Sequence, residues 1–561
     1  MAHKWWQQAV VYQIYPRSFM DSNGDGIGDL PGILARLDYL QWLGVDCLWL
    51  CPIFRSPNDD GGYDISDYQA IMAEFGTLAD FDRLLAEAHR RGMRLILDLV
   101  INHTSDEHPW FRQSRASRDN PRRDWYIWRD GKAGGPPNNW ESIFRGPAWE
   151  RDAASGQYYL HLFTRRQPDL NWENPAVRAA IGEMVRGWLD KGVDGFRIDA
   201  ITHIKKAPGL PDMPNPEGLA QVPAYPFHMN VPGILDHLDE LCRSAFHGRD
   251  LLTVGEANGL DPATAEAWVG PSHQRLSMIL QFEHWNLWSA APRAPLDVVA
   301  LKGILGRWQT SLDGRGWNAL YLENHDLPRV VSRWGDPARF RRESATALAA
   351  MYFLMQGTPF IYQGQELAMA NTQFHSLTDF QDVFAQNRIT EMRTAGWSED
   401  RILAEMTVTA RDNSRTPMPW DDGPQAGFTQ GIPWLPLNPD YPAVNVAREQ
   451  ADPASVLHFY RRLIALRRAE PVLIHGHYRP ILARNRQIYA YLRESADGGI
   501  AVICNLTPRP ARYRHGGFDL RHECLLLANL EVAPHPPCQT FTLAPFEARI
   551  YRIAGTHPGA G

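Results

Sequence analysis

Long apolar runs are missing from this sequence, and cysteine is scarce. No window of 18 apolar residues occurs, so we expect no membrane-spanning helix, and the first residues do not form the apolar stretch of a signal peptide. The six cysteines include no CxxC pair and are too few for a disulfide scaffold. We therefore expect reduced thiols, a cytoplasmic location and no membrane partner.

Excess charge of one sign is also missing. The 57 Lys and Arg residues nearly balance the 64 Asp and Glu residues, and the net charge is only −7, which gives no reason to expect a nucleic acid as partner. The chain is 44% hydrophobic, which excludes a mainly disordered protein. Aromatic residues are plentiful, with 20 Trp, and suit a site that stacks on flat apolar faces. This composition favours a neutral small molecule as the substrate. We expect the protein to be a monomer or a homodimer.

Short apolar segments alternate with longer amphipathic ones, the order typical of a parallel sheet wrapped by helices. Helices are expected, for example, at Pro31–Leu43, Leu78–Arg91, Pro175–Lys191 and Pro337–Gln356. Eight strands are expected, at Val10–Pro16, Cys47–Ile53, Arg94–Val100, Gly195–Ala200, Leu251–Ala257, Met278–His284, Asn318–His325 and Thr358–Glu366. Eight strands predict an α/β protein with a closed (β/α)₈ barrel, whose chemistry lies at the carboxyl ends of the strands.

Two connections are too long for simple barrel loops. We predict a barrel formed by residues 1–103 and 173–470, a small inserted domain at 104–172 after the third strand, and a second insertion at about 371–436. From residue 471 to 561 the pattern changes to short alternating strands, which predict a C-terminal antiparallel β-sandwich domain. The segment 202–230, with six prolines, is either a stiff wall beside the site or a plain surface loop.

Acidic residues accumulate just after the predicted strands. Asp199 ends Gly-Phe-Arg-Ile-Asp, Glu256 follows the fifth strand, and Asp326 ends Glu-Asn-His-Asp. A carboxylate at such a place is costly to bury unless it is paired, and each of them alone is more often part of a structural ion pair. At the ends of strands four, five and seven, however, the three would converge over one barrel mouth.

Two carboxyl groups across one pocket are what glycosidic cleavage requires. One is ionised and attacks or stabilises the anomeric carbon, and the other is protonated and gives its proton to the leaving oxygen. Arg197 precedes Asp199 by two residues on the same strand and therefore points to the same side. We expect it to keep Asp199 ionised with a lowered pKa.

Eight motifs in register resemble those of the α-amylase family of glycoside hydrolases, and within it the α-glucosidase and oligo-1,6-glucosidase group. They are Val-Tyr-Gln-Ile-Tyr-Pro-Arg-Ser-Phe at 11–19, Gly-Gly-Tyr-Asp at 61–64, Asp-Leu-Val-Ile-Asn-His at 98–103, Gln-Pro-Asp-Leu-Asn at 167–171, Gly-Phe-Arg-Ile-Asp at 195–199, Glu256, Glu-Asn-His-Asp at 323–326 and Arg-Asp-Asn-Ser-Arg-Thr-Pro-Met-Pro-Trp at 411–420. The resemblance covers essentially the whole chain.

The resemblance implies a role for each matching position. Asp199 would be the nucleophile that forms a β-glucosyl-enzyme, Glu256 the acid/base, and Asp326 the carboxylate that binds sugar hydroxyls. His103 and His325 would hydrogen-bond the transferred glucose, Asp64 and Arg411 would fix its far end, and Tyr63 would stack on its ring. The remaining substrate contacts implied are Phe144, Phe163, Gln167 and Arg197.

A loop after the first strand spaces oxygen donors at alternate positions, as a hard cation requires. It lacks the glutamate at position twelve of an EF-hand, where Gly32 stands, and a stretch of this kind is more often an ordinary turn. The resemblance nonetheless implies a structural Ca²⁺, with Mg²⁺ as the alternative, bound by Asp21, Asn23, Asp25, the Ile27 carbonyl and Asp29.

Linkage preference depends on the residue after the nucleophile, which in related proteins tends to be Val in 1,6-cleaving members and Ala or Thr in 1,4-cleaving ones. Ala200 therefore favours α-1,4 substrates such as maltose. Alternatives that share these motifs are an oligo-1,6-glucosidase, an enzyme that transfers glucose to sugar or alcohol acceptors, and a sucrose-isomerising enzyme. A non-catalytic barrel scaffold is the remaining alternative, although this chain keeps all three acids.

Overall fold

The computed structural model describes residues 4–289 and 293–554 and contains the predicted barrel. Its eight parallel strands are β1 (Val11–Ile14), β2 (Cys47–Leu50), β5 (Arg94–Val100), β10 (Gly195–Asp199), β12 (Leu252–Glu256), β13 (Met278–Leu280), β14 (Ala319–Leu320) and β15 (Thr358–Tyr362). They pair in the order β13-β12-β10-β5-β2-β1-β15-β14, and a parallel bridge between Ile279 and Asn318 closes the ring. All eight predicted strands are confirmed.

Helices surround the barrel because their apolar faces pack on the outside of the strands. They are α2 (Leu30–Ala35), α3 (Leu37–Leu43), α4 (Leu78–Arg90), α6 (Pro175–Asp190), α8 (Ile234–Leu241), α9 (Pro262–Val269), α11 (Val298–Ser311), α13 (Arg341–Phe353) and α18 (Val456–Ala469). The single helix expected at Pro31–Leu43 is wrong, since the backbone leaves helical geometry at Arg36 and divides it. The helix expected from Pro337 begins only at Arg341, after Phe340, whose backbone is not helical.

Inside the barrel, side chains from alternate positions fill the space between the strands. Trp49, Ile96, Val254, Met278 and Phe360 belong to this interior cluster and are buried. This packing closes the lower part of the barrel, so polar groups are confined to its upper end.

Residues after β5 form a small separate layer above the barrel. It contains α5 (Pro109–Ala116), β6 (Trp128–Arg129), β7 (Trp140–Glu141), β8 (Trp149–Arg151) and β9 (Tyr158–Leu160). The proline-rich segment 202–230 joins this layer through α7 (Tyr225–His228) and β11 (Val222–Pro223), and β11 pairs with β7. That segment is therefore a partner of the inserted domain and not a free surface loop.

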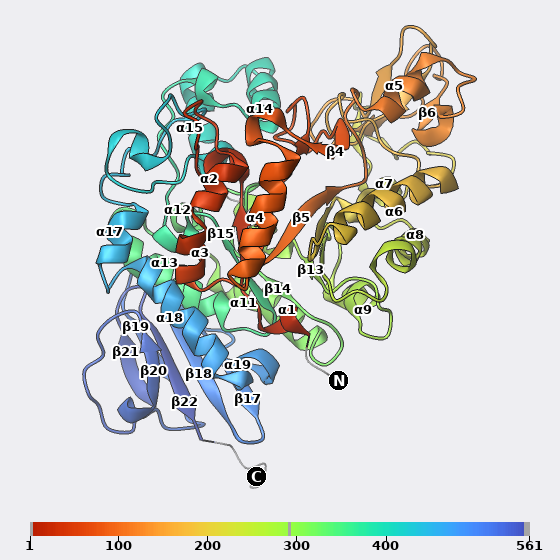
Figure 1. Ribbon diagram of the computed structural model, residues 1–561. Coiled ribbons are helices and arrows are strands. Elements are labelled where there is room, and N and C mark those ends of the chain that lie inside the picture. The colour runs from red at the N-terminus through yellow and green to blue at the C-terminus, as the bar shows by residue number, and fades with distance from the viewer. Residues whose placement is uncertain (1–3, 290–292, 555–561) are drawn as a thin grey trace.

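The segment after β15 forms the second insertion, with α14 (Val383–Thr394), α15 (Glu399–Thr409) and α16 (Asp412–Arg415). Figure 1 shows α14 and α15 at the top of the molecule, on the same side of the barrel as the inserted layer with α5 and β6. Both insertions thus lie over the carboxyl ends of the strands. The remaining short elements are α1 (Trp5–Gln8), α10 (Asn286–Ser289), α12 (Val330–Arg333), α17 (Val446–Ala451), β3 (Phe54–Arg55) and β4 (Asp67–Ile71).

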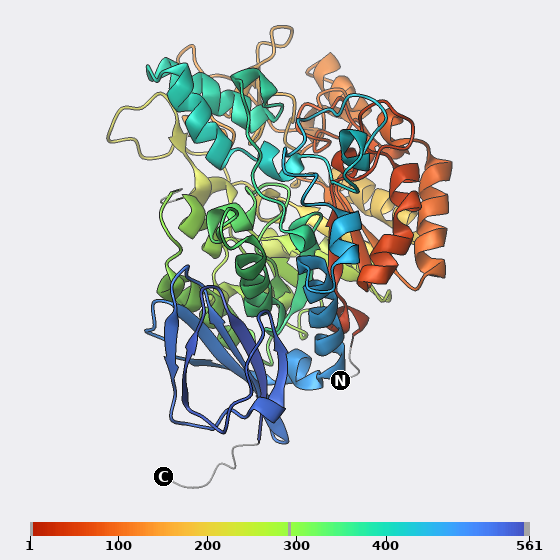
Figure 2. The ribbon, with the colours of Figure 1, turned by 90° about the vertical axis from the view of Figure 1, so that its left-hand side faces the viewer.

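After α19 (Pro471–His475) the chain forms a C-terminal β domain. An antiparallel sheet runs in the order β16-β17-β18-β22-β20, built from His477–Ile481, Ile488–Ser495, Gly498–Asn505, Ala548–Ile553 and Leu525–Ala528, and a second pair joins β19 (Ala511–Arg514) to β21 (Thr540–Leu543). Figures 1 and 2 show this domain at the bottom, far from the two insertions. The predicted end of the domain, residues 555–561, lies outside the described residues.

Across the described ranges, none of the helices is long and apolar enough to cross a membrane. All six cysteines are free thiols, and four of them, including Cys47 and Cys51, are buried.

Candidate active site

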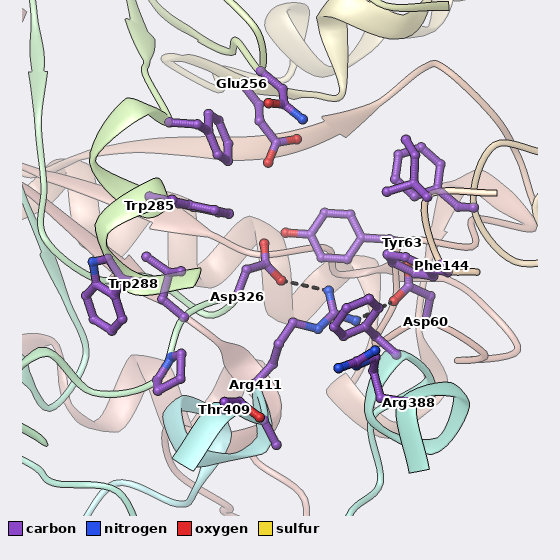
Figure 3. Close-up of a pocket in the computed structure, with 18 of the residues that line it drawn as sticks. Asp60, Tyr63, Phe144, Glu256, Trp285, Trp288, Asp326, Arg388, Thr409 and Arg411 are labelled. Atoms are coloured by element: carbon purple, nitrogen blue, oxygen red, sulfur yellow. Dashed lines mark hydrogen bonds and ion pairs between the residues drawn. The ribbon is translucent and has the colours of Figure 1, made fainter. Parts of the chain in front are cut away.

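The acidic side chains singled out in the sequence border one cavity of about 620 Å³ at the top of the barrel. Asp199 is the last residue of β10, Glu256 is the last residue of β12, and Asp326 follows β14. Figure 3 shows Glu256 and Asp326 projecting into this cavity from opposite sides. The strands thus bring the three carboxylates together, as their positions at strand ends predict.

One guanidinium group links Asp199 to Glu256. Arg197 Nη1 donates to Oδ1 of Asp199 at 2.7 Å, and Arg197 Nη2 lies 2.9 Å from Oε1 of Glu256. Nη1 also donates to Asp98 at 2.6 Å, and the backbone N–H of Ala200 donates to Oε2 of Glu256 at 2.8 Å. Because a guanidinium is small and planar, the two carboxyl groups that it bridges lie close together and share one electrostatic environment.

The predicted lowering of the pKa of Asp199 is wrong. Burial and the neighbouring Glu256 carboxylate raise the pKa of Asp199 well above its usual range, and Arg197 offsets them only in part. Two carboxyl groups this close favour a state with one proton and one negative charge between them. That state is the one that acid-assisted attack on a glycosidic bond requires.

Asp326 behaves differently from Asp199. Burial acts to raise its pKa, but the charges of Arg411 and Arg415, with His325 in contact at 3.1 Å, lower the pKa below its usual range. Arg411 Nη1 donates to Asp326 at 2.9 Å and Arg415 Nη2 donates to it at 3.1 Å. Asp326 therefore stays ionised, a fixed negative charge beside the place where positive charge would develop on a sugar.

Opposite charges close one end of the cavity. Arg411 Nη2 donates to Asp60 Oδ1 at 3.3 Å and to Asp382 Oδ1 at 2.5 Å, and the guanidinium lies over the Phe144 ring at 5.2 Å. Figure 3 shows Asp60, Phe144 and Arg411 grouped on this side. Burial raises the pKa of Asp60 to about 7, against the effect of Arg411. The charged groups of Asp60 and Arg411 therefore form one end of the cavity wall.

Asp64, which was expected at this end, is not on the cavity wall. It is fully buried, and its carboxylate accepts hydrogen bonds from the backbone N–H groups of Asp59 and Asp60 at 2.9 and 3.1 Å. Asp64 stabilises the turn from which Asp60 projects into the cavity. Asp60, and not Asp64, therefore lies on the cavity wall beside Arg411.

Tyr63 and His325 form a stacked pair beneath the cavity. Their ring centroids are 5.4 Å apart with a 5° interplanar angle, and only Tyr63 borders the cavity. His325 Nδ1 lies 2.8 Å from the Gln13 amide nitrogen, while Nε2 lies 2.7 Å from the Tyr63 hydroxyl and 3.1 Å from Asp326. Burial lowers the pKa of His325 to about 3, so it is neutral and orients Tyr63 and Asp326 from behind.

His103, Phe144 and Phe163 border the cavity as expected. His103 Nε2 lies 3.1 Å from the Tyr63 carbonyl, and burial lowers its pKa to about 3. Gln167, by contrast, is fully buried, and its amide nitrogen donates to Asp60 at 3.0 Å. It supports Asp60 from behind instead of reaching the cavity.

The predicted metal ligands lie in one turn between β1 and α2. Asp21 Oδ1 accepts from the backbone N–H groups of Asn23 and Gly24, and Asp29 Oδ1 caps α2 through the Gly32 N–H. Within the described residues, no three His, Cys, Asp or Glu side chains could hold a metal ion. A cation would need the Asn23 amide and the Ile27 carbonyl as well, and the resulting all-oxygen set is one that Ca²⁺ accepts.

Several residues at the cavity escaped the sequence analysis. Asp60, Phe384, Trp285 and Trp288 border it, and Asp382 and Arg415 hold Arg411 and Asp326 from behind. Arg415 stands within the quoted motif at 411–420, which was the one available signal. Asp382 precedes α14 in the second insertion, where no strand end marks it.

Comparisons with known proteins agree with this geometry. The profile of the alpha amylase catalytic domain matches residues 13–476. The "Probable oligo-1,6-glucosidase 3" of Bacillus subtilis (strain 168) is 54% identical over 552 residues, which cover 98% of this chain and 100% of that protein. The "Oligo-1,6-glucosidase" of Parageobacillus thermoglucosidasius is 48% identical over 563 residues, 99% of this chain and 100% of the relative.

Among solved structures, the trehalose-6-phosphate hydrolase of Bacillus licheniformis superimposes with a TM-score of 0.93 at 41% identity, over 98% of this chain and 100% of that one. The isomaltulose synthase of Erwinia rhapontici was solved as a mutant in complex with its natural substrate sucrose. It superimposes with a TM-score of 0.93 at 40% identity, over 99% of this chain and 100% of that one. The barrel, the converging acids and these similarities lead to one conclusion: the chain belongs to the α-amylase family and is a glycoside hydrolase.

Proposed function

We propose that the protein is a retaining α-glucosidase that removes α-glucosyl units from the non-reducing ends of short α-glucosides. The observation that carries the proposal is the Arg197 guanidinium, which holds Asp199 and Glu256 side by side at 2.7 and 2.9 Å. Retaining enzymes need two carboxyl groups about 5–5.5 Å apart, and inverting enzymes need a wider gap that admits water. The shared guanidinium keeps both carboxyl groups within reach of one sugar, and the family to which the chain belongs supports the retaining mechanism.

In the first step, Asp199 attacks the anomeric carbon while Glu256 gives its proton to the leaving oxygen. The glycosidic bond breaks, and a β-glucosyl ester forms on Asp199. In the second step, Glu256 takes a proton from water or from an acceptor hydroxyl, whose oxygen displaces Asp199 from the anomeric carbon. Asp326 remains ionised in both steps and stabilises the positive charge on the ring.

Action at the chain end follows from the closed side of the cavity. Asp60 and Arg411 stand where the non-reducing end of the bound glucose would lie, and their charges suit its hydroxyl groups. No second sugar fits beyond them, so one glucose unit is released at a time.

Two linkages have support. Ala200 borders the cavity beside Glu256, and its small side chain favours α-1,4 substrates such as maltose. The relatives named oligo-1,6-glucosidase favour α-1,6 substrates instead. The similarity to isomaltulose and trehalulose synthases makes transfer to a sugar acceptor, and isomerisation of sucrose, a further candidate activity. A time course of products from maltose, isomaltose, sucrose and a long maltodextrin separates these cases.

The covalent step has its own test. An activated fluorinated glucosyl donor, which forms the ester quickly and releases it slowly, should add the mass of one fluorinated glucosyl group to the peptide that contains Asp199. Asp199→Ala should remain unlabelled and lose roughly 10⁴-fold or more in kcat/KM. Labelling of another carboxylate, or wild-type protein inactive on every α-glucoside, would overturn the proposal.

A structural Ca²⁺ or Mg²⁺ in the Asp21–Asp29 turn remains a proposal and enters no catalytic step. Asp21, Asn23, Asp25, Asp29 and the Ile27 carbonyl would hold it. Free thiols also fit a reducing compartment, which supports a cytoplasmic location for the enzyme.

A further inference from the structure

The C-terminal β domain packs on the barrel through one face of its larger sheet. Alternate side chains of β17 point to opposite faces, so Ala490 and Leu492 lie in the core of the domain itself, whereas Tyr491 belongs to the core of the barrel. The Tyr491 hydroxyl donates to the Met351 carbonyl of α13 at 3.0 Å. Arg493 follows Tyr491 by two residues and therefore lies on the same face, inside the interface.

Arg493 is fully buried in this interface and has no hydrogen-bond partner among the described residues. Its Nε, Nη1 and Nη2 are all shielded from solvent and donate to neither a carbonyl nor a carboxylate. At every other arginine of residues 4–289 and 293–554, at most one buried nitrogen lacks a partner. Because a buried N–H group without an acceptor costs desolvation energy, the five N–H groups of this guanidinium need one.

A second buried arginine adds positive charge to the interface. Arg467 of α18 is also fully buried, and its Nη1 donates to the carbonyl groups of Phe353 and Met355 at 3.1 and 2.9 Å, while Nη2 donates to the Gly357 carbonyl. Burial lowers the pKa of Arg493 to about 10. Burial and the charge of Arg493 lower the pKa of Arg467 to about 9. Both guanidinium groups are therefore protonated at neutral pH, and their charges lie in one region of the interface.

Negative charge does not balance these two groups within the part of the chain that the structure describes. Asp313, which follows α11, acts electrostatically on Arg493 but forms no ion pair with it. Its carboxylate instead lies 2.6 Å from His477 Nδ1. Carbonyl oxygens accept hydrogen bonds from Arg467 but carry no net charge. The interface thus buries two positive charges without a paired negative one, an arrangement that is costly in a low-dielectric interior.

The surroundings restrict the class of ligand that would balance the charges. Tyr478 pairs with Arg493 across the sheet, and its ring lies 5.1 Å from that of Tyr491. Since these neutral rings and the closed interface exclude solvent, a large or strongly hydrated anion would lose too much hydration energy there. A water molecule would accept from Arg493 but would leave both charges unbalanced. We propose that a small monovalent anion of the chloride class binds Arg493 in this interface and is attracted by Arg467 as well.

Such an anion would tie the C-terminal domain to the barrel. Arg467 belongs to the last barrel helix and Arg493 to the β domain, so separation of the two units would separate the charges that attract the ion. A ligand that binds only the docked state stabilises that state by mass action. Figure 1 shows β17 and β18 at the bottom of the molecule, far from α14 and α15 above the active site. The anion therefore takes no part in cleavage.

Anomalous diffraction locates the anion. Wild-type crystals grown in sodium isethionate, whose anion is too large for the interface, are soaked in sodium bromide, because bromide replaces chloride and scatters anomalously. We expect an anomalous peak at hydrogen-bond distance from the Arg493 nitrogens and no such peak in Arg493→Met. Absence of a peak beside Arg493 in the wild type would overturn the inference.

Thermal unfolding measures the effect of the anion on stability. The melting temperature of the wild type is compared in sodium chloride and in sodium isethionate at equal ionic strength. We expect chloride to raise it by about 2 °C or more and the rise to level off as the site saturates. A wild type that melts at the same temperature in both salts would contradict the inference.

Two variants separate this site from a general effect of salt. Arg493→Met should melt at one temperature in both salts, whatever its own stability. Arg512→Met removes an exposed arginine of β19 in the same domain and should keep the full rise. A chloride-dependent rise of wild-type size in Arg493→Met would show that the ion acts elsewhere. Where Arg493→Met does not fold, the bromide position in wild-type crystals decides.

Discussion

The backbone N–H of Ala200 donates a hydrogen bond of 2.8 Å to the carboxylate of Glu256. The residue after the proposed nucleophile therefore positions the proposed acid and also borders the cavity. Its backbone is left-handed, with φ of 44°, a conformation that branched side chains rarely adopt. A change at this position should alter geometry at the leaving oxygen more than binding of the transferred glucose.

We expect Ala200→Val to change linkage preference. The larger side chain narrows the space beside the scissile bond, so kcat/KM for maltose should fall about tenfold relative to kcat/KM for isomaltose. The melting temperature is measured alongside, because a branched residue strains a left-handed backbone. Ala200→Ser, which is small, provides the control, and an unchanged ratio in a folded valine variant would contradict this role for Ala200.

Arg197 should govern the acidic limb of the pH profile. The guanidinium lowers the pKa of Asp199 against burial and Glu256, so Arg197→Gln removes that effect and raises the pKa further. Asp199 must be ionised to attack, and activity will therefore be lost at a higher pH as the solution is acidified. We expect the acidic limb of the kcat/KM profile to shift to higher pH. We also expect the maximum kcat/KM to fall about 10²-fold or more.

Two further variants support that measurement. Arg197→Lys keeps a positive charge and should move the limb less. Arg94→Gln removes an arginine from β5 that pairs with Asp194, at the amino end of its strand, and should leave the profile in place. Identical pH limbs in Arg197→Gln and the wild type would show that Arg197 does not set the ionisation of Asp199.

Asp382 is expected to be a positioning residue for Arg411. Its carboxylate accepts from Arg411 at 2.5 Å and from Arg415 at 3.1 Å, and it is buried. Asp382→Asn weakens the hold on Arg411, so KM for maltose should rise about tenfold while kcat changes much less. Asp400→Asn, an exposed acid of α15 in the same insertion, is the matched control. A loss confined to kcat would point to a role in the chemical step instead.

Buried His284 should make the protein sensitive to acid. Burial lowers its pKa to about 3 in the folded state, against about 6.5 in the unfolded chain. Between these values the unfolded chain binds more protons, so stability is full above pH 6.5 and declines as the pH falls toward 3. From pH 7 to pH 5 this group alone should cost about 2 kcal/mol of unfolding free energy.

The measurement is denaturant unfolding of the wild type and His284→Gln at both pH values. Raised carboxyl pKa values act in the opposite direction, but they are common to the two proteins and cancel in the comparison. The variant should lose about 2 kcal/mol less than the wild type on acidification, whatever its stability at pH 7. Parallel losses would show that His284 is not held neutral.

Removal of divalent cations tests the proposed metal turn. Chelation should lower the melting temperature, and Ca²⁺ should restore it, because a ligand at 100 times its Kd stabilises the folded state by about 2.7 kcal/mol. Asp25→Ala should make stability independent of Ca²⁺, while Asp38→Ala, an exposed acid elsewhere, should not. A melting temperature indifferent to chelation would leave the turn as an Asx-type loop without a metal.

The barrel was accessible from the sequence because its signal is local. Each strand is a short apolar run, and the acids that matter follow directly where those runs stop, as Asp199 and Glu256 do. The division of the first helix at Arg36 carries no comparable signal, since the apolar period continues across it.

The choice between Asp60 and Asp64 was beyond sequence reasoning. Both stand in one acidic, glycine-rich turn, and which carboxylate faces the cavity depends on backbone conformation. Gly61 and Gly62 adopt φ of 57° and 96°, which reverses the chain and directs Asp64 back toward the N–H groups of the turn. The periodicity of hydrophobic residues in the sequence does not encode such a reversal. Asp382 lies far along the chain and reaches Arg411 only through tertiary packing.

The charged wall of Asp60 and Arg411 has a consequence for polymers. An enzyme whose cavity is closed beyond a single glucose ring can act only at the non-reducing ends of an amylose chain. It cannot cleave bonds within the chain. Any glucose that this protein releases from a long α-glucan would therefore come from the non-reducing ends, and the viscosity of the solution would fall only late in the reaction.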